Sequence, residues 1–261
     1  MEEFPGEGWV RRIVIRLKQM RGMEISLHAS HACFFMMLSV FPGLLLVVGF
    51  LRYTELRVED LIALLEGSIP DALEPYIWRI VSDAFEKSSV GLLSLSAMMA
   101  LWSSGRGILG LMRGLNSIYG VSDDRGWLRI RLTGMCYTLL FLLALIGTVV
   151  LYVFRRVVPW INWGFFAVVA VQTLLFTAMF MFLPNQRNGF RESLPGALFS
   201  SLGWMAFSGL FSVYVDHFNR YTNIYGSVYG VALAMLWLYM CVSIVFYGAV
   251  LNRFLKENGK I

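Results

Sequence analysis

Six long stretches of this chain contain no Asp, Glu, Lys or Arg, and they constrain its fold more than any other feature. They cover residues 28–51, 88–105, 132–154, 157–186, 193–215 and 221–252. An α-helix rises about 1.5 Å per residue, so about 20 apolar residues cross the roughly 30 Å hydrocarbon layer of a bilayer. Each stretch is long enough, or nearly so, for one crossing. We therefore predict an all-α, polytopic membrane protein with six transmembrane helices.

The basic residues are distributed unevenly between alternate loops, which predicts the orientation of the chain. Of the 22 Lys and Arg, 15 belong to segments on one side of the predicted membrane and seven to the loops on the other side. The 15 lie before residue 28, at the end of the second predicted span, in the loops 120–132 and 184–196, and after residue 252. Cytoplasmic loops carry an excess of Lys and Arg, so both termini are predicted to be cytoplasmic. The net charge of +5 then reflects topology and attraction to anionic membrane lipids, and nucleic acid is not an expected partner.

The same patterns divide the chain into segments. The predicted spans are about 28–51, 88–112, 132–154, 163–183, 194–215 and 225–251. Residues 1–27 form a cytoplasmic segment that either lies as an amphipathic helix on the membrane or only sets orientation, and residues 253–261 form a cytoplasmic tail. The outer loop 52–87 has a net charge of −4 and helical apolar spacing, which predicts two short amphipathic helices. These helices either cap the bundle or receive an envelope protein partner.

Arg106 is unusual because it lies inside the second predicted span, after 18 uncharged residues and before six more. An arginine at the middle of a membrane helix costs about 2.5–3.5 kcal/mol unless its side chain reaches the interface. Arg113 and Ser103 fall on the same helix face, which Asn116 and Ser117 extend to the membrane surface. Two interpretations remain open. Either both arginines extend to cytoplasmic head groups, or they bind an anion, most simply a lipid phosphate, within an inward-opening cavity.

Proline and glycine in the predicted spans suggest places where helices bend or slide. Pro42 and Gly43 lie near the middle of the first span, where proline removes one helical hydrogen bond. Gly226 and Gly230 belong to a set of small residues in the last two spans that allows helices to approach closely. Each feature is consistent with conformational change, and more often such features belong to static packing.

No set of residues in the sequence predicts catalysis. His28 and His31 share a helix face, and with Asp216 and His217 they resemble a metal-binding set. The predicted topology places the two pairs at opposite ends of the bundle, roughly 30 Å apart, so they cannot share an ion. The sequence also lacks a nucleophile with an adjacent base and a phosphate-binding glycine loop. We therefore expect no catalytic residue, no metal and no cofactor.

Several motifs, in order and spacing, resemble those of the YihY/BrkB family of bacterial inner-membrane proteins. The motifs are Ser39-Val40-Phe41-Pro42, Leu101-Trp102-Ser103-Ser104-Gly105-Arg106-Gly107, Leu115-Asn116-Ser117-Ile118-Tyr119, Leu194-Pro195-Gly196-Ala197, Tyr225-Gly226-Ser227 with Gly230, and Leu236-Trp237-Leu238-Tyr239 leading to Gly248-Ala249 and Asn252. In the family the closing motif usually reads Gly-Ala-Glu-Leu-Asn, whereas Val250 replaces the glutamate here. A family role for that carboxylate therefore does not transfer to this chain.

The resemblance implies a six-helix protein of the bacterial inner membrane, from a family with an old ribonuclease BN label. RNA hydrolysis requires a metal cluster or a positioned acid and base, and the sequence supplies neither. Our hypothesis is that the protein binds or moves an amphipathic, anionic envelope molecule such as a lipid. Arg106 and Arg113 would bind its head group. The alternatives are a scaffold that docks envelope proteins and, less favoured, a ribonuclease.

Overall fold

The computed structural model describes residues 22–51, 90–122, 125–126, 128–130, 132–137, 164–217 and 222–259, and all regular structure in these ranges is helical. The helices are α2 (Ile25–Leu51), α5 (Val90–Tyr119), α7 (Gly164–Phe182), α8 (Phe190–His217) and α9 (Thr222–Glu257). Each of them lies over one predicted span, so the all-helical prediction is confirmed for these residues. The segment 1–21, the outer loop 52–87 and most of the third predicted span lie outside the described residues.

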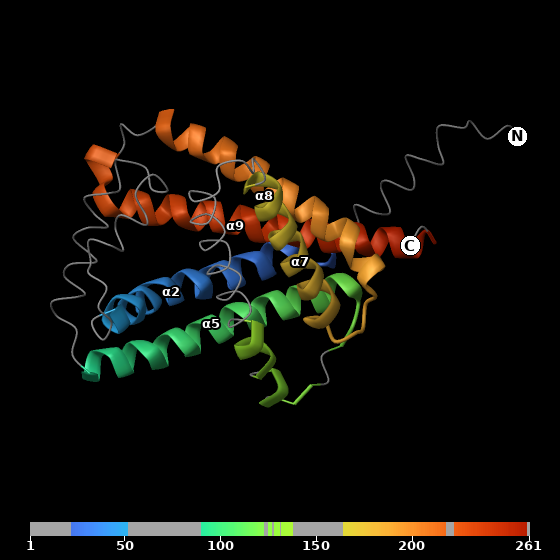
Figure 1. The fold of residues 1–261 in the computed structure, drawn as a ribbon, viewed down its shortest axis with the longest axis horizontal. Helices are drawn as coiled ribbons and strands as arrows, with labels where there is room; N and C mark the ends of the chain where they lie inside the picture. The colour runs from blue at the N-terminus through green and yellow to red at the C-terminus, as the bar shows by residue number, and fades with distance from the viewer. Residues whose placement is uncertain are drawn as a thin grey trace, which may run out of the picture.

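Helix α9 is the centre of the bundle (Figure 1). It packs against α2, α5 and α8, while α2 packs against α5 and α7 packs against α8. The pair α2 and α5 runs antiparallel, because Ser117 near the end of α5 donates a hydrogen bond to the carbonyl of Met23 just before α2. The pair α8 and α9 is also antiparallel, because Gly196 near the start of α8 contacts Gly248 near the end of α9.

Helix α5 extends beyond the predicted membrane span, as the expected helix face that includes Asn116 and Ser117 requires. The predicted span stopped at residue 112, just before Arg113, but the helix continues for two more turns to Tyr119. The helix ends at Gly120, which has a positive φ of 68°, a conformation that glycine adopts without strain. Gly120 N–H donates to the carbonyl of Ser117 and Val121 N–H donates to that of Asn116, which is the Schellman pattern of helix termination. A charged residue therefore marked the edge of the apolar segment and not the end of the helix.

The loops that the charge pattern assigned to one side of the membrane do meet at one end of the bundle. Arg253 of α9 donates a hydrogen bond of 2.5 Å to the carbonyl of Ile118 at the end of α5. Asn185, in the loop between α7 and α8, donates its N–H to the side-chain oxygen of Asn116. We call this the loop end. The contacts agree with the predicted grouping of loops, while the side of the membrane on which they lie stays a prediction.

Glycines set the closest approaches between helices. A methyl group at Gly107 would lie 2.9 Å from Cγ of Met36, and one at Gly110 would lie 2.9 Å from Cα of Ala32. A methyl group at Gly196 would overlap the carbonyl oxygen of Gly248. Because real Cβ atoms do not approach other atoms this closely, α5 fits against α2, and α8 against α9, only with glycine at these positions.

The outer surface of the bundle is apolar, as expected for a protein surrounded by lipid. Leu210 is 72% exposed, Met98 and Val213 are each 68% exposed, and Phe182 is 64% exposed. Within the described residues, Phe190–Val215 and Tyr229–Glu257 are long and apolar enough to cross a membrane, and Ile25–Ser39 and Val169–Phe182 are shorter apolar helices. These features support membrane association, and the count of six crossings stays a prediction.

Candidate functional site

Arg106 lies on the exposed edge of the α2–α5 pair, against two aromatic rings. Its guanidinium carbon is 5.2 Å from the ring centroid of Trp102 and 5.7 Å from that of Phe35. The two rings contact each other edge to face, with centroids 5.9 Å apart. A cation over an aromatic face is attracted by the ring quadrupole, and more strongly where water is excluded. Trp102 precedes Arg106 by one turn, so the guanidinium is directed away from the loop end of α5.

This orientation bears on the two interpretations of Arg106. The residue lies 13 positions before the end of α5 at Tyr119, which corresponds to about 20 Å along the helix axis. A side chain extended toward head groups at the loop end would point along the helix toward Arg113. The aromatic contacts instead hold the guanidinium at the depth of Trp102. In this conformation the guanidinium does not extend toward the loop end, and the choice between the two interpretations stays a prediction.

Arg113 lies two turns further along the same edge and is also exposed. Neither α2 nor α5 contains an acidic residue. Among the described residues, no carboxylate lies within ion-pair distance of Arg106 or Arg113. Two guanidinium groups on one helix edge thus lack a counter-ion in this part of the chain. Such a pair can accept an anion without first breaking an ion pair.

The other predicted binding residues have partners within the protein. Ser103 is 1% exposed, and its hydroxyl donates to the carbonyl of Met99 in the same helix. Asn116 is 4% exposed and accepts from Asn185, while Ser117 donates to Met23. Arg106 and Arg113 therefore lie on one exposed helix edge, whereas these three polar side chains make hydrogen bonds within the protein.

The predicted bending residues lie within unbroken helices. Helix α2 continues through Pro42, which is buried, and Gly43. Gly230 lies within α9, and a methyl group there would meet no atom within 4 Å. Gly226 also lies in the backbone of α9. Nothing in one conformation tests whether these positions bend, so their conformational role stays a prediction.

The two histidine pairs lie on different parts of the bundle. His28 lies near the loop end, where its Cβ is 3.0 Å from the position of a methyl group at Gly114. His217 ends α8, and the other end of that helix, at Gly196, packs near the loop end. A helix of 28 residues is about 40 Å long, so the two pairs are far apart. No group of three His, Cys, Asp or Glu in the described ranges is placed to hold a metal ion.

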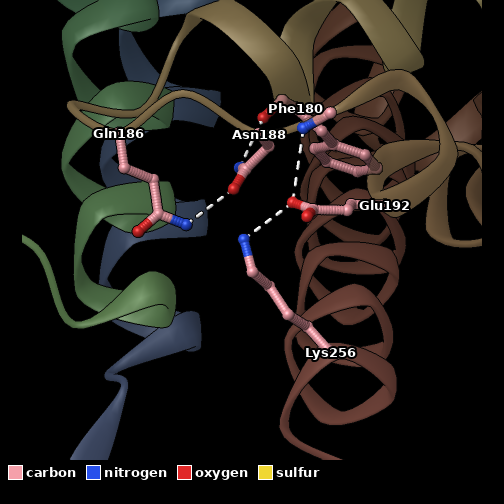
Figure 2. Close-up of polar contacts among 6 residues, drawn as sticks. Phe180, Gln186, Asn188, Glu192 and Lys256 are labelled. Atoms are coloured by element: carbon pink, nitrogen blue, oxygen red, sulfur yellow. Dashed lines mark hydrogen bonds and ion pairs between the residues drawn. The ribbon is translucent and has the colours of Figure 1, made fainter. Parts of the chain in front are cut away.

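A polar network that the sequence did not predict organises the start of α8 (Figure 2). Asn188 donates to the carbonyl of Phe180, and its side-chain oxygen accepts from Gln186 at 2.7 Å. The carboxylate of Glu192 accepts from Gly189 N–H at 3.3 Å and from Lys256 of α9 at 2.7 Å. Glu192 thus caps the first turn of its own helix and links it to α9.

Asn252 makes a further set of contacts in this region that the sequence did not predict. It is 3% exposed, accepts from Gly196 N–H at 2.6 Å, and donates to the carbonyl of Ser193 at 3.1 Å. Tyr119 lies nearby, and burial raises the pKa of its hydroxyl above the ordinary value. Asn252 belonged to a recognised motif, but only the helix crossing shows that its side chain joins α9 to the backbone of α8.

Comparison with known proteins gives consistent matches. A ribonuclease-like protein, YfkH of Bacillus subtilis, is 28% identical over 251 residues, covering 89% of this chain and 90% of YfkH. A UPF0761 membrane protein of Pseudoalteromonas atlantica is 25% identical over 280 residues, covering 95% of this chain and 88% of that protein. A UPF0761 membrane protein of Idiomarina loihiensis is 25% identical over 206 residues, covering 72% of this chain and 68% of that protein. No solved structure matches. The profile of the family described as virulence factor BrkB matches residues 17–260, and this chain, a membrane protein, therefore belongs to that family.

Proposed function

We propose that the protein binds, and moves within the membrane, an amphipathic anionic molecule of the cell envelope, with Arg106 and Arg113 as the contacts for its head group. The observation that carries this proposal is the pair of exposed guanidinium groups on α5 without a carboxylate partner among the described residues. A guanidinium offers several N–H donors to phosphate or carboxylate oxygens. The bacterial inner membrane is the proposed location.

The surface next to the arginines favours an amphipathic ligand over a free anion. Along the same edge of α5, Trp102 is 45% exposed and Met99 is 49% exposed. On the adjacent face of α2, Phe34 is 50% exposed and Leu38 is 42% exposed. These residues continue away from the loop end, beyond Arg106. A ligand whose charged head contacts the arginines would thus lay an apolar chain along this stripe.

The conformational part of the proposal concerns transport. The site would open toward the loop end, and bending of α2 at Pro42 and Gly43 would alter the width of the α2–α5 edge. Gly226 and Gly230 would permit α9 to move against its neighbours. Residue type supports this part, because glycine and proline lower the cost of local rearrangement in a helix.

The decisive experiment measures lipid binding and movement by purified protein in reconstituted vesicles. Arg106→Gln and Arg113→Gln are each expected to weaken binding of an anionic lipid about tenfold or more, because a charge-assisted hydrogen bond is lost. Arg187→Gln is the matched control, since Arg187 is exposed in the loop between α7 and α8 and lies off the edge. If folded Arg106 and Arg113 variants bind and move the lipid as the parent does, the proposal is wrong.

The name of YfkH, a ribonuclease-like protein, raises the alternative of RNA cleavage. That name describes YfkH, and we propose a non-enzymatic role for this chain, since its two arginines fit binding without supplying an acid–base pair. Incubation of the pure protein with RNA, with and without added divalent metal, separates the two ideas. Cleavage that persists in the Arg106→Gln variant and copurifies with the protein would contradict a purely binding role.

A further inference from the structure

Two histidines of α2 lie beside the two arginines of α5. A methyl group at Gly110 would lie 2.7 Å from Nδ1 of His31, so the imidazole packs directly against α5. His31 is within electrostatic range of both Arg106 and Arg113, and His28 is within range of Arg113. Glycine at the crossing is what permits this approach. Four basic side chains from two helices, at positions 28, 31, 106 and 113, therefore form one basic cluster.

Few opposing charges surround the cluster. In the described part of the chain, Glu24 is the carboxylate that interacts with His28, and the charged groups that interact with His31 are Arg106 and Arg113. His31 is only partly buried, and its ring also packs against Phe35 with centroids 5.0 Å apart. The two guanidinium groups repel each other, and a bound anion relieves this repulsion.

Resting on the proposed function, we infer that His31 contacts the bound anion directly and that the preferred ligand is a lipid whose head group is a phosphate monoester. Its charge of about −1.5 to −2 near pH 7 matches the two guanidinium groups, and its three terminal oxygens suit three donors. His31 packs over Gly110, which follows Arg106 by four positions and precedes Arg113 by three, so its imidazole lies between the two arginines. It supplies the third donor once the Arg106 side chain turns from Trp102 toward it, and His28 extends the cluster toward the loop end. A phosphodiester head group carries a single charge and leaves one guanidinium unmatched.

The apolar stripe commits the ligand to a lipid source of phosphate. Phe34 follows His31 by three positions and Trp102 precedes Arg106 by four, so both lie one turn from the cluster on the side away from the loop end. Both are about half exposed, at 50% and 45%. Acyl chains gain from contact with such a surface, while inorganic phosphate gains nothing there. Inorganic phosphate is therefore expected to compete weakly.

The test uses the full chain in nanodiscs of phosphatidylcholine and compares binding of labelled phosphatidate, a monoester, with labelled phosphatidylglycerol, a diester. The parent should prefer phosphatidate. His31→Leu should reduce this preference roughly tenfold, because one donor to the third oxygen is lost. His31→Lys, which keeps an N–H donor, should retain it. Ser30→Ala is the matched control, since Ser30 is exposed and its hydroxyl donates to the carbonyl of Leu27 in its own helix.

The outcomes separate this inference from the proposed function. If the arginine variants lose binding while His31→Leu keeps the preference of the parent, the histidine assignment is wrong and the proposed function stands. Equal affinity of the parent for the two lipids, or competition by inorganic phosphate as strong as that by phosphatidate, overturns the head-group assignment. Identical behaviour of His31→Leu and His31→Lys shows that His31 only packs, which overturns the histidine assignment. If all arginine and histidine variants bind as the parent does, both proposals fail.

Discussion

The crossing of α8 and α9 at Gly196 and Gly248 permits a quantitative test of how this bundle is held together. In Gly196→Ala the new methyl group would overlap the carbonyl oxygen of Gly248 and lie 2.6 Å from Nδ2 of Asn252. Backbone atoms cannot move aside as a flexible side chain can, so the helices must separate. Separation also stretches the 2.6 Å hydrogen bond from Gly196 N–H to Asn252.

The expected cost follows from these contacts. Overpacking against backbone costs about 1–3 kcal/mol, and weakening two buried hydrogen bonds adds about 1 kcal/mol each. Alanine recovers up to about 1 kcal/mol because it favours the helix more than glycine does. The net loss is about 3 kcal/mol, which corresponds to a fall in melting temperature of roughly 6–12 °C for a protein of this size.

The assay is thermal unfolding of the detergent-solubilised protein, followed by its elution profile after heating. Two other glycines of α8 provide a graded control. A methyl group at Gly203 would lie 2.8 Å from the end of the Ile244 side chain, which can move, so a cost of about 1 kcal/mol is expected. A methyl group at Gly209 meets no atom within 4 Å, so Gly209→Ala should be neutral or slightly stabilising. Equal melting temperatures for Gly196→Ala and Gly209→Ala would refute the argument.

Three further predictions concern the loop end and the topology. Asn252→Ala should destabilise the fold by about 2 kcal/mol, because two buried backbone groups of α8 lose their hydrogen-bond partner. Asn258→Ala, at an exposed position, is the control. Equal melting temperatures of the two variants would count against a structural role of Asn252. Lys256→Gln should lower the free energy of unfolding by at most about 1 kcal/mol, because the Lys256 side chain, which pairs with Glu192, is 46% exposed. High salt should diminish this loss, and a loss that salt does not change would contradict a surface ion pair. Cysteines at Arg187 and His217 should react with membrane-impermeant reagents from opposite sides, and labelling from one side would exclude α8 as a crossing helix.

The main outline of the fold could be predicted because charge is costly in lipid. Charge-free segments located the helices, and the bias of basic residues grouped the loops around Gly120, Asn185 and Arg253 that meet at the loop end. The end of α5 could not be located in this way, because helix length and apolar length differ. Gly120 supplied the relevant signal, as a residue suited to the positive φ that terminates the helix.

The site was predictable only in part. An arginine within an apolar span stands out in the sequence, but the direction of its side chain depends on Trp102 and on Phe35 of another helix. His31 drew attention as a possible metal ligand, whereas the packing of α2 on α5 places it beside basic residues. The roles of Gly196 and Asn252 depend on which faces of α8 and α9 cross, and the spacing of small residues indicates that close crossings occur without saying where.

The central position of α9 has a consequence for biosynthesis. A ribosome releases α2, α5 and α8 before α9, yet α9 packs against all three. Until it inserts, the backbone of α8 around Gly196 lacks the partner amide of Asn252, and the end of α5 lacks the guanidinium of Arg253. The pairs α2–α5 and α7–α8 can pack before α9 is made, but α9 is the helix that joins these two pairs. Synthesis interrupted before residue 252 should yield a chain that the quality-control proteases of the membrane remove.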